Sequence, residues 1–287
     1  MIKREKVIRL GGVPEHFNMP VHLAIEKGLF GEKGLRVDWV EFPDGTGAMN
    51  KALRSGKIDM AIILTEGIIR DIANGNPSKI IQNYVSSPLR WGVHVDAKSS
   101  FDTIDSLEGK RVAISRMGSG SHVMAYVQAH EKKWNTTDLE LIEIGTVDKA
   151  IEALANNSAD YFMWEHFTTK PLVDKGIFKH LGDFPTPWSS FVIAATDDFI
   201  EAHTPDISNF LKVLNAVTIQ FKKIESIDKS IAENYGQKLV DVQKWLSITT
   251  WSQEQISEEE LKIVQERLLE LKMIDHHNEN DFFLSNI

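Results

Sequence analysis

The chain has 287 residues, a net charge of −9 at pH 7, and apolar and charged fractions of 42% and 25%. This length suits about two domains of about 150 residues each. The ordinary composition excludes a disordered or fibrous chain, and the acidic balance argues against a nucleic-acid partner. No apolar run reaches the ~18 residues of a membrane span. The absence of cysteine excludes disulfides, a thiolate nucleophile and a Cys-bound zinc.

The N-terminal segment MIKREKVIRLGG carries positive charge but no apolar stretch behind it, so no signal peptide is visible. If Met1 is the natural start, we expect a cytoplasmic protein. If Met1 was added to a trimmed chain, a removed export signal would place the protein in the periplasm or another extracytoplasmic space.

The first half of the chain alternates strand and helix patterns, which is typical of an α/β fold with a mainly parallel sheet. Pro20 and Gly28 mark the start and the end of the first predicted helix. The expected strands of this first series are residues 6–13, 36–42, 58–65 and 79–85, and the expected helices are 19–30, 43–56 and 66–76.

A second α/β series begins near Trp91, and a helical tail follows it. The second series is expected to contain a short helix and a strand within 102–115, helices at 120–134 and 147–159, and strands at 139–145 and 160–165. After residues 191–200 the alternation stops. Apolar residues then recur every three or four positions, as in 258–273, which predicts helices. The order of elements therefore indicates two similar lobes, with a helical tail packed on the first.

Two segments resemble substrate-binding proteins of the nitrate, sulfonate, taurine and thiamine-precursor type. The first is MPVHLAIEKGLFGEKGLRVDWVEFPDGTGAMNKALRSGKIDMAI, with its A-x-E-K-G-x-F and A-L-x-x-G-x-x-D spacings, and the second is DSLEGKRVAISRMGSGSH. The resemblance spans roughly residues 6–195. It implies the type 2 periplasmic-binding fold, in which two lobes close on a ligand held in the cleft between them.

On that resemblance we expect a discontinuous first lobe made of residues 1–91 and 193–287. The inserted second lobe is expected to be residues 92–192. Chain crossings are expected near 88–91 and 193–197.

The ligand site is expected where strands of such a sheet run into helix N-termini, because open α/β sheets bind ligands beyond the carboxyl ends of their strands. Small residues there let a ligand approach the backbone, and hydroxyls add hydrogen-bond partners. The candidates in these turns are Gly45, Thr46, Thr65, Glu66, Met117, Gly118 and Ser119. The alternative is that the hydroxyls only cap helices. Capping and binding can coexist, because a helix start has more than one free donor.

Other candidates lie in loops and at strand ends on the same side. They are His16, Phe17, Asn18, Arg90, Trp164, Glu165 and Trp188. A tryptophan there can stack on a flat ligand, and Glu165 can hold a cationic or N–H-bearing group. The alternatives are an ordinary solvated turn for residues 14–18, core packing for Trp164 and an exposed turn position for Glu165. For Trp188 the alternative is a segment made rigid by Pro185 and Pro187, and for Arg90 it is a surface ion pair.

From these residues we expect a protein that binds a small polar solute, a thiamine-precursor-like pyrimidine or a sulfonate, for uptake with an ABC-transporter permease or for sensing. We expect a monomer, no cofactor, no metal, no membrane insertion and no nucleic-acid partner. The alternative is a cytoplasmic lyase or hydrolase on the same scaffold, with His16, His122 or Glu165 as acid or base.

Overall fold

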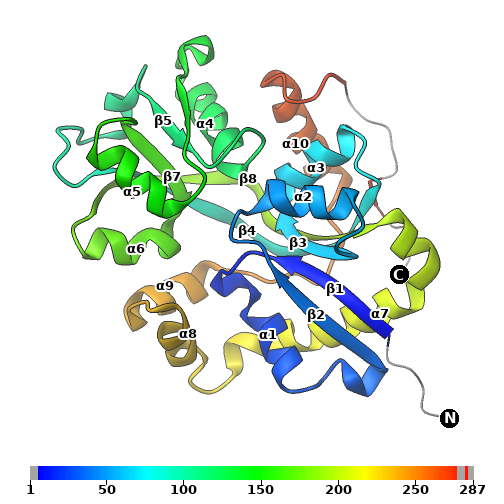
Figure 1. Ribbon diagram of the computed structural model, residues 1–287. Coiled ribbons are helices and arrows are strands. Elements are labelled where there is room, and N and C mark those ends of the chain that lie inside the picture. Colours follow the sequence, from blue (N-terminus) through cyan, green and yellow to red (C-terminus); the bar gives the residue numbers. More distant parts are fainter. Residues whose placement is uncertain (1–5, 277–281, 284–287) are drawn as a thin grey trace.

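The computed structural model describes residues 6–276 and 282–283. Its strands form a single eight-stranded sheet across these residues, in the order β2-β1-β3-β8-β4-β7-β5-β6. Figure 1 shows β5, β7 and helices α4 to α6 gathered on one side and β1 to β3 with α1 on the other, with β4 and β8 running between them.

The strands are β1 (Lys6–Gly12), β2 (Leu35–Glu41), β3 (Met60–Leu64), β4 (Ser78–Asp96), β5 (Val112–Ile114), β6 (Leu141–Glu143), β7 (Tyr161–Glu165) and β8 (Phe178–Thr196). The helices are α1 (Met19–Glu26), α2 (Thr46–Arg54), α3 (Thr65–Ala73), α4 (Gly120–Glu131), α5 (Val147–Ala155), α6 (His166–Asp174), α7 (Asp197–Gln220), α8 (Ile227–Tyr235), α9 (Leu239–Ile248) and α10 (Glu258–Glu270). The predicted α/β fold is confirmed.

Within each group the neighbouring strands are parallel, as the alternation of strands and helices predicts. β1 pairs with β2 and β3, and β5 pairs with β6 and β7, all in parallel. The apolar segment of β3 is buried on both faces, with Met60 to Ile63 at 0% exposure. The expected short helix near residue 104 is only a 3-10 turn at Ile104–Leu107.

The two long strands make the sheet mixed, because β8 runs antiparallel to β3 and β4, and β4 runs antiparallel to β7. The β4–β8 register shifts several times between Asn83 and Arg90. Pro88 lies in this irregular stretch, and Pro185 pairs at its edge. Proline lacks an N–H donor and is confined to irregular or edge positions of sheets. The boundaries of the two lobes stay a prediction.

The C-terminal helices pack more widely than the sequence predicts. α7 contacts α1 and α10 contacts α3, in the group that contains β1 to β3. The tail also reaches α6, where Gln237 Nε2 donates to the carbonyl of Phe167 (3.1 Å) and Lys238 pairs with Asp174 (2.8 Å). No helix in the part of the chain that the structure describes is long and apolar enough to cross a bilayer.

Candidate ligand-binding site

One cavity lies at the carboxyl ends of β1, β3, β5 and β7, where the helix N-termini begin. It contains about 470 Å³ of empty space when the solvent at its open mouth is included. The residues that line it are Val13, Glu15, Asp44, Gly45, Thr46, Leu64, Leu89, Trp91, Ser115, Ser119, Gly120, Ser121, Trp164, Glu165 and Phe191. The glycine and hydroxyl turns at the start of α2 and at the start of α4 therefore face the same space.

The turn before α4 uses much of its hydrogen-bonding capacity on itself. Ser119 caps the helix, since its Oγ accepts from the N–H of His122 (3.3 Å). Ser121 Oγ accepts from the N–H of Ser115 (3.0 Å), and His122 Nδ1 accepts from the N–H of Gly118 (3.0 Å). Burial and the charge of Arg70 lower the pKa of His122 to about 4, so its ring is neutral at pH 7. Capping and cavity lining coexist at Ser119.

An arginine side chain lies over each of the two glycine turns. Arg70 of α3 lies over Gly118, and Arg116, which precedes α4, lies over Gly47. A Cβ on Gly118 would lie 2.2 Å from Arg70 Nη1, and a Cβ on Gly47 would lie 2.8 Å from Arg116 Nε. Gly118 also has φ +79°, a conformation that L side chains rarely adopt. Each of these glycines therefore lets an arginine side chain lie directly against the backbone.

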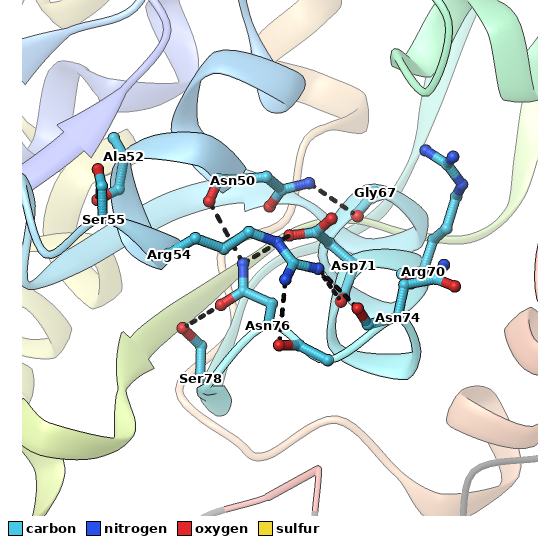
Figure 2. A network of polar contacts seen from close by, with 11 residues as sticks. Asn50, Ala52, Arg54, Ser55, Gly67, Arg70, Asp71, Asn74, Asn76 and Ser78 are labelled. Atoms are coloured by element: carbon cyan, nitrogen blue, oxygen red, sulfur yellow. Dashed lines mark hydrogen bonds and ion pairs between the residues drawn. The ribbon is translucent and has the colours of Figure 1, made fainter.

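A polar network holds α2 against α3 and so fixes the position of Thr46. Figure 2 shows Arg54 reaching Asp71, with Nε 2.9 Å from Oδ2. Asn76 Nδ2 donates to the same carboxylate, and Asn50 Nδ2 donates to the carbonyl of Gly67 (3.1 Å). Arg70 points away from this network in Figure 2.

Three aromatic side chains, those of Trp91, Trp164 and Phe191, form part of the cavity wall. The ring centroids of Trp91 and Trp164 are 6.4 Å apart at 74°, in an edge-to-face arrangement. Trp91 Nε1 is buried and has no hydrogen-bond partner among the described residues. A buried donor without a partner costs free energy, so a ligand acceptor at this position would be favoured.

Gly120 lets the wall formed by β3 and β4 approach the start of α4. A Cβ there would lie 2.5 Å from Leu64 Cδ1 and 2.9 Å from Trp91 Cη2. We therefore expect Gly120→Ala to lower the free energy of unfolding by about 1–3 kcal/mol, because both side chains must shift. Denaturant unfolding measures this loss. Gly31→Ala is the matched control, since a Cβ at Gly31 meets nothing within 4 Å; an equal loss in both variants would contradict the packing argument.

Three acidic residues line the cavity, namely Glu15, Asp44 and Glu165. Burial, together with the charge of Glu165, raises the pKa of Glu15 to about 8. Burial also raises the pKa of Glu165, although Thr168 opposes this by donating its N–H (2.6 Å) and its hydroxyl (2.8 Å) to Oε2. A cationic or N–H-bearing ligand would therefore interact favourably with these carboxyl groups.

Comparison with known proteins agrees with this architecture. A family model described as a Ca3427-like periplasmic-binding protein matches residues 91–184. The solved structure of the Candida albicans CA3427 gene product, which exhibits the generic periplasmic binding protein fold, is 26% identical with a TM-score of 0.87; the match covers 95% of this chain and 92% of that one. The chain therefore has the fold of the periplasmic binding proteins.

Two further solved structures with this fold are sulfonate-binding proteins of bacteria. The alkanesulfonate-binding protein SsuA of Xanthomonas axonopodis pv. citri, solved with MOPS, is 18% identical with a TM-score of 0.79, and the match covers 93% of this chain and 94% of that one. SsuA of Escherichia coli is 19% identical with a TM-score of 0.71, at 96% and 90% coverage. No curated protein matches the chain.

Five of the candidates from the sequence line the cavity. They are Gly45, Thr46, Ser119, Trp164 and Glu165. They come from the starts of α2 and α4 and the end of β7, three of the strand-to-helix junctions that the sequence pattern indicates.

The loop candidates His16, Phe17 and Asn18 are buried behind the cavity and do not line it. The His16 ring stacks on Phe17 (4.9 Å between centroids) and meets Trp245 of α9 edge-on (4.2 Å). Asn18 Nδ2 donates to the carbonyl of Val13 (2.8 Å). These side chains therefore hold the loop that carries Val13 and Glu15.

Thr65, Glu66 and Trp188 are also buried away from the cavity lining. Trp188 Nε1 donates to Glu66 Oε2 (2.8 Å), so the indole satisfies one oxygen of a buried carboxyl. Burial raises the pKa of Glu66 to about 7. This buried hydrogen-bonded pair therefore belongs to the core of the protein.

The remaining candidates lie outside the cavity lining. Arg90 pairs with Asp183 (3.2 Å), which is the surface ion pair that we gave as its alternative. Met117 is 56% exposed, and Gly118 lies under Arg70. Sequence reasoning missed Glu15, Leu89 and Phe191 as lining residues. It placed Trp91 beside the cleft only through the expected chain crossing and did not include it among the candidates.

Proposed function

We propose that the chain binds a small planar solute bearing an amino or protonated nitrogen, such as a pyrimidine of the thiamine-precursor type. The observation that carries this proposal is the combination of two tryptophans with three carboxyl groups around one cavity. Indole faces favour flat rings, and carboxylates accept hydrogen bonds from amino groups. Trp91 Nε1 would donate to a ring nitrogen.

The same lining disfavours the sulfonate alternative. No Lys or Arg belongs to the described residues that line the cavity, whereas Glu15, Asp44 and Glu165 do. A sulfonate placed there would be repelled by every lining carboxyl group that is ionised and would find no cationic side chain in the lining. The SsuA proteins therefore share the fold with this chain, while the cavity chemistry here favours a different class of ligand.

The proposed role is solute capture for uptake through an ABC-type permease, or for sensing. In this proposal residues 1–91 and 193–287 form one lobe and residues 92–192 form the other, and the lobes close on the solute. Thr46 would contribute from the first lobe, and Ser119 and Glu165 from the second. The long strands β4 and β8 would carry the motion between them.

A thermal-shift experiment with matched ligands tests the proposal. A ligand at 100 times its Kd adds about 2.7 kcal/mol, which corresponds to roughly 4–5 °C for a chain of this size. We expect 4-aminopyrimidines to raise the melting temperature, and 4-hydroxypyrimidines and aliphatic sulfonates of similar size to have little effect. A larger shift with sulfonates would refute the proposed ligand class.

The raised pKa of Glu15 favours one second candidate, acid–base catalysis on a bound solute. Mass spectrometry of a ligand that has been incubated with the protein separates the two functions. Recovery of unchanged ligand after long incubation supports binding alone, and its conversion by hydrolysis or elimination supports the enzyme alternative.

A further inference from the structure

A second cluster of polar side chains lies outside the cavity, where α6 begins beside β4 and β8. His166 Nδ1 is 2.7 Å from Asp183 Oδ1, and His180 Nε2 is 2.9 Å from the same oxygen. One ligand atom from each of these residues lies within 4.8 Å of the others. Two imidazole nitrogens and a carboxylate oxygen are a donor set that zinc and related transition metals prefer.

The backbone of β8 is irregular in the way that this convergence requires. Residues three apart on a regular strand point to opposite faces of the sheet. Val93 pairs with Gly182 and His94 pairs with His180, so Leu181 is an extra residue in β8. Gly182 has φ +152°, which L side chains rarely adopt. This bulge brings His180 and Asp183 to one side, and such bulges are common beside functional sites.

Gly92 leaves space for the neighbouring histidines, and Oδ1 of Asp183 faces His166 and His180. A Cβ on Gly92 would lie 2.6 Å from His94 Nε2 and 3.4 Å from the Cα of His166. Arg90 Nη1 donates to Asp183 Oδ2 (3.2 Å), so Oδ1 remains directed at the two histidines.

A third histidine lies beside the cluster. His94 is 1% exposed, and its ring centroid is 5.4 Å from that of His180. Its Nε2 is 2.7 Å from Thr169 Oγ1, and its Nδ1 is buried without a hydrogen-bond partner among the described residues. A buried polar atom without a partner calls for an explanation such as an ordered water or a bound ion.

We propose that His166, His180 and Asp183 form a binding site for one divalent transition metal, with zinc as the chemically best matched ion. Zinc lies about 2.0–2.2 Å from nitrogen and oxygen ligands, so its tetrahedral ligand atoms are roughly 3.3 Å apart. Small side-chain movements would reach that spacing from the present contacts. A water molecule would complete the coordination. Because His166 directly follows Glu165, a bound metal would also fix the start of α6 next to the solute cavity.

Metal titration of the full, tag-free chain after chelator treatment tests this site. We expect one Zn²⁺ per chain by calorimetry and a visible absorption band of tetrahedral cobalt when Co²⁺ replaces zinc. We also expect zinc to raise the melting temperature, because it binds the folded state only. A wild-type chain that binds neither metal more tightly than the millimolar range would overturn the proposal.

Matched variants locate the metal. Asp183→Asn and His180→Gln are expected to weaken zinc binding by about 100-fold or more, since changes outside the ligand shell alone cost 10–100-fold. His203→Gln is the control, because His203 also pairs with an aspartate three residues away, Asp206 (3.2 Å). Circular dichroism checks that each variant is folded. Equal affinity in Asp183→Asn and His203→Gln would overturn the assignment.

Discussion

Glu165→Gln is expected to weaken binding of an amine-bearing ligand by at least about tenfold, because a hydrogen bond to a charged group contributes about 1.5–3 kcal/mol. Glu165 is 3% exposed and lies in the cavity lining. Glutamine keeps the shape and a carbonyl oxygen that can still accept from Thr168, so the cap of α6 is retained. Calorimetric titration of wild type and variant with an aminopyrimidine measures the loss.

Glu201→Gln on the exposed surface of α7 removes the same charge and serves as the control. It is expected to bind the aminopyrimidine as wild type does. The affinity of wild type for the amine is also expected to rise with pH until the ligand itself loses its proton, because burial raises the pKa of Glu165 and the ionised carboxylate is the better acceptor. Unchanged affinity in Glu165→Gln would remove the carboxylate from the proposed recognition.

Glu15→Gln is expected to change the dependence of stability on pH. Burial and the charge of Glu165 raise the pKa of Glu15 from 4.5 to about 8. The folded chain therefore holds the proton more tightly than the unfolded chain, and this stabilisation is complete below about pH 4.5 and is lost as the pH rises through 8. Glutamine does not titrate, so the variant is expected to gain about 2–4 kcal/mol relative to wild type between pH 5 and pH 9.

Urea unfolding of both proteins at several pH values measures this difference. Comparing the two proteins cancels the contributions of other buried groups, such as Glu66 and His94, whose pKa values are also shifted by burial. A difference between variant and wild type that is the same at pH 5 and pH 9 would show that Glu15 ionises normally.

The sequence predicts those parts of the fold that depend on local patterns. The alternation of strand and helix patterns places β1 to β3 and α1 to α3 near their observed bounds, because short apolar strands and helices with one buried face leave a local signal in the sequence. The sequence pattern does not reveal that β8 begins at Phe178. Gly182, Pro185 and Pro187 interrupt its periodicity, and only pairing with β4 keeps this segment extended.

The candidate site likewise contains some residues that the sequence predicts and others that it does not. Thr46 and Ser119 are predictable because small and hydroxyl residues mark helix starts. His16 resembles an exposed loop residue in sequence, yet Trp245, more than two hundred residues later, covers its ring. His180 and Asp183 face one another only because of a bulge in β8. Contacts between distant segments and single-residue register shifts leave no periodic signal in a single sequence.

The irregular stretch of β4 and β8 has a mechanical consequence. Between Asn83 and Arg90 the register with β8 shifts repeatedly, and Pro88, Pro185 and Pro187 in this stretch cannot donate main-chain hydrogen bonds. A sheet resists torsion through its ladder, so the ladder is most compliant where it is already broken. A rotation concentrated at this junction would break few hydrogen bonds. The strands and helices on either side could then move as rigid bodies without repacking their interiors.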